Sequence, residues 1–178
     1  MNEKMLRGNV TVLAAYPEAF ADPAKPTTAE FNDQYNSASN KGGMVFNISC
    51  ALLDDGVELN LTDSETDDTR TICDIGQVQN PTFPTYEASL DGLRDEDTEA
   101  DSGYNLFWHL FKGEDRPYWL VKRIGGSNTD PFEVGDVVQM FGVNTDLPED
   151  IVDDNEWIKF GARFKPNGDI NFNYTLEA

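Results

Sequence analysis

One amphipathic helix between two strand-like segments limits the folds open to this chain. Residues 102–113 read SGYNLFWHLFKG, and their aromatic and aliphatic side chains recur at the three- and four-residue spacing of a helix. Ser102 suits the N-cap, and Lys112 suits the last turn. The flanking segments, Thr82–Gly92 and Arg116–Gly126, contain the aromatic and β-branched residues typical of strands. An apolar helix face this wide predicts packing on a sheet.

The rest of the sequence favours a mainly β fold. The expected strands are Asn9–Ala15, Met44–Leu53, Val57–Leu61, Arg70–Val78, Thr82–Leu90, Pro117–Ile124, Val134–Val143, Glu156–Lys165 and Ile170–Leu176. The turn signals Asp54-Asp55-Gly56 and Pro166-Asn167-Gly168-Asp169 predict hairpins over 44–61 and 156–176. Thr62–Thr69 is expected as an acidic loop. We therefore predict an antiparallel β-sandwich or barrel with one packed α-helix, in a single domain over residues 1–178.

Residues 16–43 interrupt this pattern and are expected to form an extended arm or loop region. Pro17, Pro23 and Pro26 forbid a continuous element here. Thr28 is a candidate N-cap for one or two helical turns. A loop of this length inside a compact domain is usually functional, so the segment is expected either to contact a neighbouring molecule or to decorate the fold.

The charge of the chain excludes several classes of function. Its 33 acidic and 13 basic residues give a net charge of −20, which repels nucleic-acid phosphates. Wrapping DNA on a basic surface is therefore excluded, whereas guiding DNA past without binding it is compatible with this charge. With 39% hydrophobic residues the chain has enough apolar side chains for a core. No stretch approaches the roughly 20 apolar residues of a spanning helix, so no membrane partner is expected.

No group of residues supplies a reaction, a metal site or a cofactor site. His109 is the single histidine and has no Ser, Cys or Asp partner at an informative spacing. The acidic run DSETDD at 63–68 resembles a calcium loop, but Asp68 stands where that loop needs glycine. Cys50 and Cys73 belong to no metal-binding spacing and are expected to be reduced, with a disulfide as the alternative. We expect no catalytic, metal or cofactor-binding residues, and no enzyme.

Several aromatic and cationic residues fall on the outward side of strands whose other side is apolar. They are Trp119, Arg123, Trp157, Lys159 and Arg163. Aromatic and arginine side chains in such positions are typical of a subunit interface. The alternative is ordinary packing inside a fold with two layers.

The order of these elements resembles that of the major tail tube proteins of phages with long non-contractile tails. The stretch DIGQVQNPTFPTYEASLDG, residues 74–92, looks especially like tail tube sequences. These proteins share a structural group with the tube proteins of contractile tails and of type VI secretion. The resemblance implies hexameric rings stacked into a tube, in which strands of six subunits join into one barrel around the lumen. It also implies a virion protein, assembled in the host cytoplasm, with tape measure, tail terminator and distal tail proteins as partners.

The resemblance also implies that carboxylates line a lumen through which DNA passes without specific binding. Glu87 and Asp91, on the polar face of one expected strand, and Asp136, in another, are the candidates. The alternative function is a monomeric acidic β-sandwich that binds calcium or carbohydrate.

Overall fold

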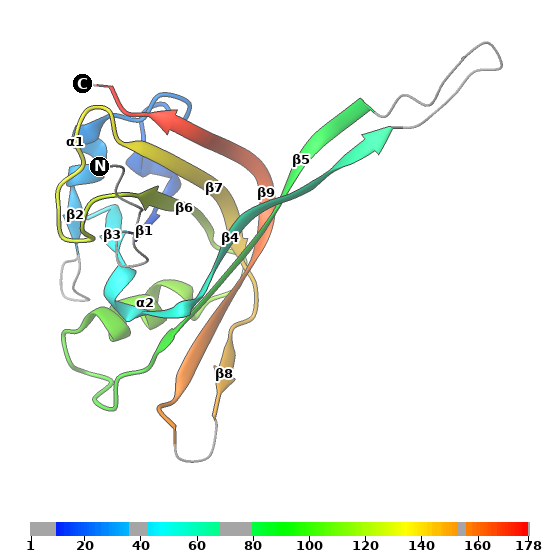
Figure 1. Ribbon diagram of the computed structural model, residues 1–178. Helices are drawn as coiled ribbons and strands as arrows, with labels where there is room; N and C mark the ends of the chain where they lie inside the picture. Colours follow the sequence, from blue (N-terminus) through cyan, green and yellow to red (C-terminus); the bar gives the residue numbers. More distant parts are fainter. Residues whose placement is uncertain (1–9, 36–42, 68–79, 153–155, 178) are drawn as a thin grey trace, which may run out of the picture.

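The computed structural model describes residues 10–35, 43–67, 80–152 and 156–177. Its strands form one curled, mostly antiparallel sheet in the order β2-β3-β1-β6-β7-β9-β5-β4, with β8 paired to β9 (Figure 1). Among the strand pairs of the described residues, only β2–β3 is parallel. The strands are β1 (Val10–Ala15), β2 (Gln34–Tyr35), β3 (Val45–Asn47), β4 (Leu52–Asp67), β5 (Asn80–Leu93), β6 (Pro117–Ile124), β7 (Val137–Thr145), β8 (Glu149–Ile151) and β9 (Lys159–Thr175). The mainly β, antiparallel class predicted from the sequence is confirmed.

Helix α2 (Gly103–Phe111) is the main helix and begins and ends where the sequence indicates. The Ser102 hydroxyl accepts a hydrogen bond from the backbone N–H of Asn105, and Lys112 is the C-cap. The Tyr118 hydroxyl donates to the Leu110 carbonyl at 2.8 Å, which ties the last turn of the helix to β6. The predicted helix is confirmed.

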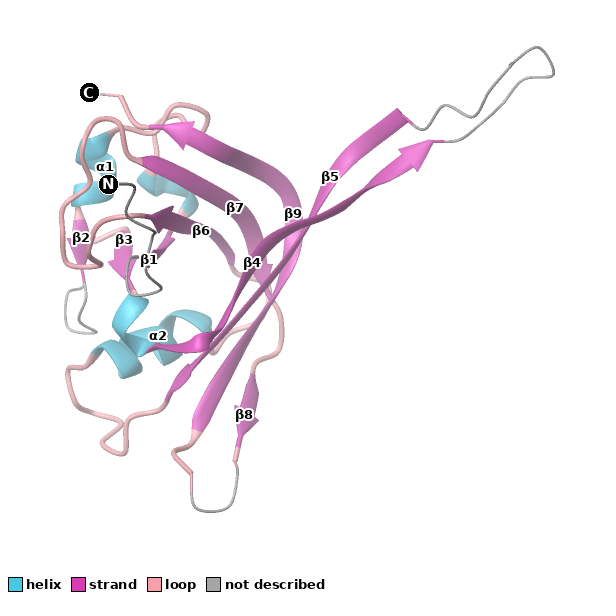
Figure 2. Ribbon diagram, viewed as in Figure 1, coloured by secondary structure: helices cyan, strands magenta, loops and turns pink. Residues whose placement is uncertain are grey.

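The middle strands of the sheet are apolar on both faces because each face has its own cover. The core under α2 includes Leu59, Tyr86, Leu90, Phe107, Phe111, Leu120, Phe141 and Phe160. The second core includes Leu13, Phe20, Phe31, Trp119, Val121, Phe132 and Met140. Short helices η1 (Pro17–Ala19) and α1 (Thr28–Asn32) lie over this second core, away from α2 (Figure 2).

Residues 17–35 of the expected arm therefore pack on the sheet. Phe20 and Phe31 are buried and in contact, with ring centroids 5.0 Å apart. The N-cap of α1 is Thr27 and not Thr28, because the Thr27 side chain and Glu30 form a capping box. Residues 36–42 lie outside the described part of the chain.

The closing hairpin predicted over residues 156–176 is wrong, because β9 continues through it as one bent strand. Its first residues pair with β5 (Ser89 opposite Arg163), and the rest pair with β7 (Thr145 opposite Phe164). Pro166–Asp169 forms an irregularity in β9 opposite Gly142, where the register with β7 shifts. The residues Pro166–Asp169 therefore bend the strand and do not reverse the direction of the chain.

The hairpin predicted over residues 44–61 is also wrong. Asp54-Asp55-Gly56 lies inside β4, where the register with β5 shifts between Leu52 and Val57. The strand β4 pairs with β5 and not with β3, and η2 (Ser49–Ala51) separates the two. The expected acidic loop at 62–69 is strand as far as Asp67. Residues 68–79, which include the expected strand Arg70–Val78 and Cys73, lie outside the described residues.

Candidate assembly surface

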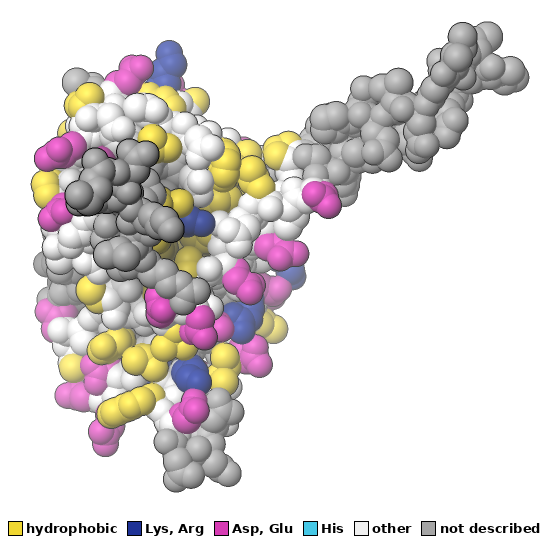
Figure 3. Space-filling model, in the orientation of Figure 1, with side chains coloured by type: hydrophobic (Ala, Val, Ile, Leu, Met, Phe, Trp, Pro, Cys, Tyr) yellow, Lys and Arg dark blue, Asp and Glu magenta, His cyan; other side chains and the backbone are white. Residues whose placement is uncertain are grey.

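Strands β4, β5, β9 and β8 form a four-stranded sheet with one apolar and one polar face. Along β5, Tyr86, Ala88 and Leu90 are buried, whereas Glu87 is exposed and Asp91 is partly exposed. This alternation follows from the opposite orientation of successive side chains in a strand. The apolar side packs beneath α2, so the polar side forms an outer surface of the molecule. Acidic side chains gather where β4 and β5 leave the body of the molecule and below that point, with a few Arg and Lys among them (Figure 3).

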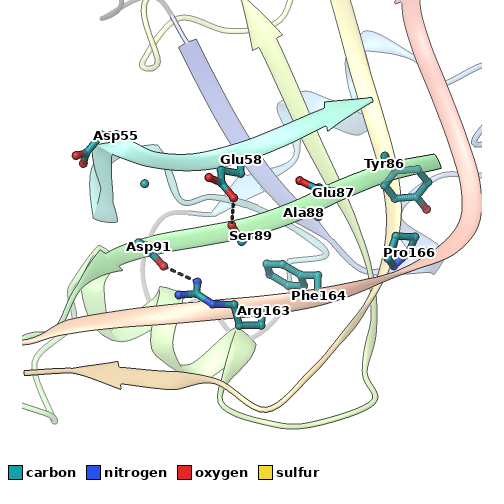
Figure 4. A pocket seen from close by; sticks show the side chains of 11 residues that line it. Asp55, Glu58, Tyr86, Glu87, Ala88, Ser89, Asp91, Arg163, Phe164 and Pro166 are labelled. Atoms are coloured by element: carbon teal, nitrogen blue, oxygen red, sulfur yellow. Dashed lines mark hydrogen bonds and ion pairs between the residues drawn. The ribbon is translucent and has the colours of Figure 1, made fainter. Parts of the chain in front are cut away.

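Arg163 is the central cation of the polar face. Its guanidinium forms ion pairs with Asp91 at 2.5 Å (Figure 4) and with Glu149 at 3.3 Å. The hydrogen bond that Arg163 donates to Asp91 raises the pKa of Arg163, so the guanidinium stays protonated. Beside it, the Ser89 hydroxyl donates to Glu58 at 3.0 Å. Glu87 forms no ion pair with any described residue.

Both lateral edges of this sheet are open. Within the described residues β4 pairs only with β5, and β8 pairs only with β9. At the outer edge of β4, the Lys122 ammonium donates to the Leu59 carbonyl at 3.0 Å. Burial lowers the pKa of Lys122. An unpaired strand edge is a template for another strand.

Strands β4 and β5 extend beyond the body as a two-stranded arm (Figure 1). Their pairing continues from Val57 opposite Leu90 to Asp67 opposite Asn80. A two-stranded ribbon with no further cover is marginally stable in water, so an arm of this kind gains stability when it contacts another surface.

The predicted interface residues fall into two groups. Trp119 and Arg123 are buried within the chain itself, at 8% and 2% exposure. The guanidinium of Arg123 lies over the Phe132 ring, 4.1 Å from its centroid, and binds the Asp136 carboxylate at 3.1 Å. Asp136 precedes β7 and is not in a strand as predicted, because its carboxylate also accepts from the Glu133 N–H in a turn.

The other group lies on the surface near the β8–β9 hairpin. Trp157 is 75% exposed, Lys159 pairs with Glu156 at 2.6 Å, and Arg163 lies on the polar face. Two residues that the sequence analysis did not single out, Val152 and Ile158, are also exposed here, at 70% and 49%. Ile158 is on the same side of the chain as the buried Phe160. It is exposed because neither α2 nor another described element covers the end of the hairpin.

His109, the acidic side chains and Cys50 are the other residues that the sequence analysis considered for chemistry. His109 is exposed on α2, where its Nδ1 lies 3.1 Å from the Lys112 ammonium. Partial burial, and then the nearby charge of Lys112, lower the pKa of His109. Among the described residues no three His, Cys, Asp or Glu side chains are placed to share a metal ion. The Cys50 thiol is free and exposed.

Helices in the described part of the chain are all too short or too polar to cross a bilayer. A search of the curated proteins found no match. The family model for phage tail tube proteins matches residues 1–178. Because this match spans the full length, the chain belongs to the phage tail tube protein family, whose members are structural proteins of the virion tail that assemble with themselves and with other tail proteins.

Proposed function

We propose that this protein forms hexameric rings that stack into the phage tail tube and enclose a conduit for DNA. The four-stranded sheet β4-β5-β9-β8, open at both edges and polar on one face, is the observation that carries the proposal. The β4 edge of one subunit pairs with the β8 edge of the next, and six such sheets close a barrel. Strand pairing of this kind leaves no edge exposed around the ring.

The polar face of the sheet lines the lumen in this arrangement. Glu87 lies there without an ion pair among the described residues, together with Glu58, Asp91 and Glu149. Arg163 neutralises part of this charge, and the remainder repels phosphate. Asp136, Trp119 and Arg123 are held inside the protomer and are not part of the proposed lumen or interface.

The proposed partners follow from the same role. The tape measure protein occupies the lumen during assembly, and tail terminator and distal tail proteins close the two ends of the tube. Assembly takes place in the host cytoplasm, and DNA passes the acidic wall without specific binding. The protein has a structural and not a catalytic role in this proposal.

The test blocks the outer edge of β4. The Leu59 carbonyl points outward to Lys122, and backbone groups alternate along a strand, so the N–H of Leu61 also points outward. Leu61→Pro removes that donor without touching the bonds to β5. We expect the wild-type chain to form rings and tubes in electron micrographs and Leu61→Pro to remain monomeric.

Leu61→Thr is the matched control, because it shortens the same exposed side chain and keeps the N–H. We expect it to assemble like the wild type. A wild-type chain that stays monomeric at high concentration would refute the proposed function, and a Leu61→Pro variant that forms normal rings would refute the pairing at this edge.

A further inference from the structure

The end of the β8–β9 hairpin carries three large apolar side chains that no described part of the protomer covers. Val152 follows β8, and Trp157 and Ile158 precede β9; their exposed fractions are 70%, 75% and 49%. We call these three residues the apolar tip. Residues 153–155 lie outside the described part of the chain. Exposed apolar side chains gathered at one place mark an interaction surface.

The apolar tip is anchored to the body at its β9 side. The N–H of Arg94, just after β5, donates to the Ile158 carbonyl at 3.0 Å. Two residues further along, Phe160 is buried against the Phe107 ring, with centroids 5.4 Å apart. The backbone that presents Ile158 is therefore held in one position, which reduces the ordering cost of binding.

Three described carboxylates near the apolar tip have cationic partners. Glu149 pairs with Arg163 at 3.3 Å, Asp150 with Arg94 at 3.4 Å, and Glu156 with Lys159 at 2.6 Å. Exposed ion pairs of this kind contribute little to stability. They do lower the local net charge, in a chain whose overall charge of −20 makes two copies repel each other. Arg94, Lys159 and Arg163 therefore offset part of the repulsion that a second copy meets at this end of the molecule.

We propose that the apolar tip docks on a second copy of this chain in the adjacent ring and so holds rings together along the tube. This inference rests on the proposed function. In a barrel, strand edges face lateral neighbours and strand ends face the rings above and below. The apolar tip lies at the strand ends, on the opposite side of the molecule from the β4–β5 arm (Figure 1). Contacts between unlike ends of identical subunits propagate as an open filament.

The experiment compares the full-length chain with the double variant Val152→Ser and Trp157→Ser. Both side chains are mostly exposed, so the variant should fold, which circular dichroism and the unfolding midpoint check. We expect electron micrographs and sedimentation velocity to show single rings, with a several-fold loss of tube length. The matched control is Val134→Ser, whose side chain is 64% exposed in the loop before β7. We expect it to form tubes of wild-type length.

The outcomes separate the inference from the proposed function. Rings without long tubes support the docking of the apolar tip between rings. Tubes of wild-type length in the double variant would overturn it, and so would an equal loss in Val134→Ser. A folded double variant that stays monomeric would also overturn it, because the apolar tip would then act within the ring. A wild-type chain without rings would refute the proposed function and the inference with it.

Discussion

The Arg123 side chain organises the loop between β6 and β7. Its guanidinium donates to the carbonyls of Ser127 (2.8 Å), Pro131 (3.0 Å) and Asp130 (3.1 Å), to the Thr11 hydroxyl (3.1 Å) and to the Asp136 carboxylate (3.1 Å). These bonds join β1, β6 and the loop through one buried cation. Arg123 is therefore the residue on which the shape of that loop depends.

Replacing Arg123 should destabilise the fold without removing any exposed contact. Arg123→Leu leaves three loop carbonyls and the Asp136 carboxylate without their donor, so we expect the free energy of unfolding to fall by about 3 kcal/mol. Chemical denaturation of the monomer measures this. Lys165→Ala is the control, because Lys165 is an exposed cation paired with Asp146, and its midpoint should match the wild type. Equal midpoints for both variants would refute the role of Arg123.

For single residues, the sequence predicted correctly which side chains share one face of a strand. It predicted less well whether that face is exposed to solvent. The side chains of Phe160, Ala162 and Phe164 are buried as their spacing indicates. Trp119 and Arg123 lie on the face of β6 that points away from α2. From the sequence alone, that face could be either solvent-exposed surface or a second core. The cover over Trp119 comes from η1 and α1, far earlier in the chain, whereas the loop after β6 covers Arg123. Spacing within one strand carries no information on either contact.

Among the elements, α2 is held by the Tyr118 hydroxyl at its C-terminal end. Burial raises the pKa of Tyr118 to about 12 from an ordinary value of 10.0. Because the pKa of Tyr118 is higher in the folded protein than in the unfolded chain, the protonated hydroxyl favours folding. This contribution to the free energy of unfolding is complete below pH 10 and is lost as the pH rises toward 12.

Tyr118→Phe should lower the free energy of unfolding by about 1 kcal/mol at neutral pH, because the Leu110 carbonyl loses its donor. It should also lose less stability than the wild type between pH 10 and pH 12. Urea midpoints at neutral and alkaline pH measure both effects. Tyr104→Phe, in an exposed tyrosine of the same helix, should follow the wild-type pH profile. A Tyr118→Phe variant with an unchanged alkaline loss would contradict the argument.

The bend of β9 depends on close contact with Gly142. A Cβ at Gly142 would lie 2.4 Å from the Asn167 side-chain oxygen and 2.8 Å from the Asp169 Cβ. The Tyr86 hydroxyl also donates to the Gly142 carbonyl, so this point joins β5, β7 and β9. We expect Gly142→Ala to cost about 1–3 kcal/mol of folding free energy, measured by thermal or chemical unfolding.

Gly103→Ala is the control for that substitution, because a Cβ there meets no atom within 4 Å and alanine favours the helix. Its unfolding midpoint should equal or exceed that of the wild type. A Gly142→Ala variant as stable as Gly103→Ala would show that the bend tolerates a side chain.

Elements with a clear period were predictable, and connections were not. The spacing of apolar residues identified α2, β1 and β6 nearly to the residue. Asp-Gly and Asn-Gly steps were read as turns between hairpin strands, but in β4 and β9 they bend a strand that continues. Whether such a step reverses the chain depends on the partner strand, and the partners β5 and β7 are far away in the sequence.

At the scale of the whole molecule, the proposed lumen implies that the negative charge of Glu87 keeps DNA from binding to the wall of the tube. Glu87→Lys should leave tubes intact and make them bind DNA, with an affinity that falls steeply as salt rises. DNA retention by purified tubes at low and high salt measures this. Glu133→Lys, which changes the charge equally in the loop before β7, should leave DNA binding at the wild-type level. Equal binding by both variants would show that Glu87 does not face the DNA.

The bent strand β9 has a mechanical consequence. It pairs with β5 at one end and with β7 at the other, so a single backbone runs from the polar four-stranded sheet into the doubly covered part of the molecule. A force that pulls on the polar sheet reaches β7 through covalent bonds and a ladder of hydrogen bonds loaded in shear. The two parts of the subunit cannot slide past each other unless that ladder breaks along its length. Bending a tube of such subunits would therefore concentrate the strain between protomers, and the protomers themselves would stay rigid.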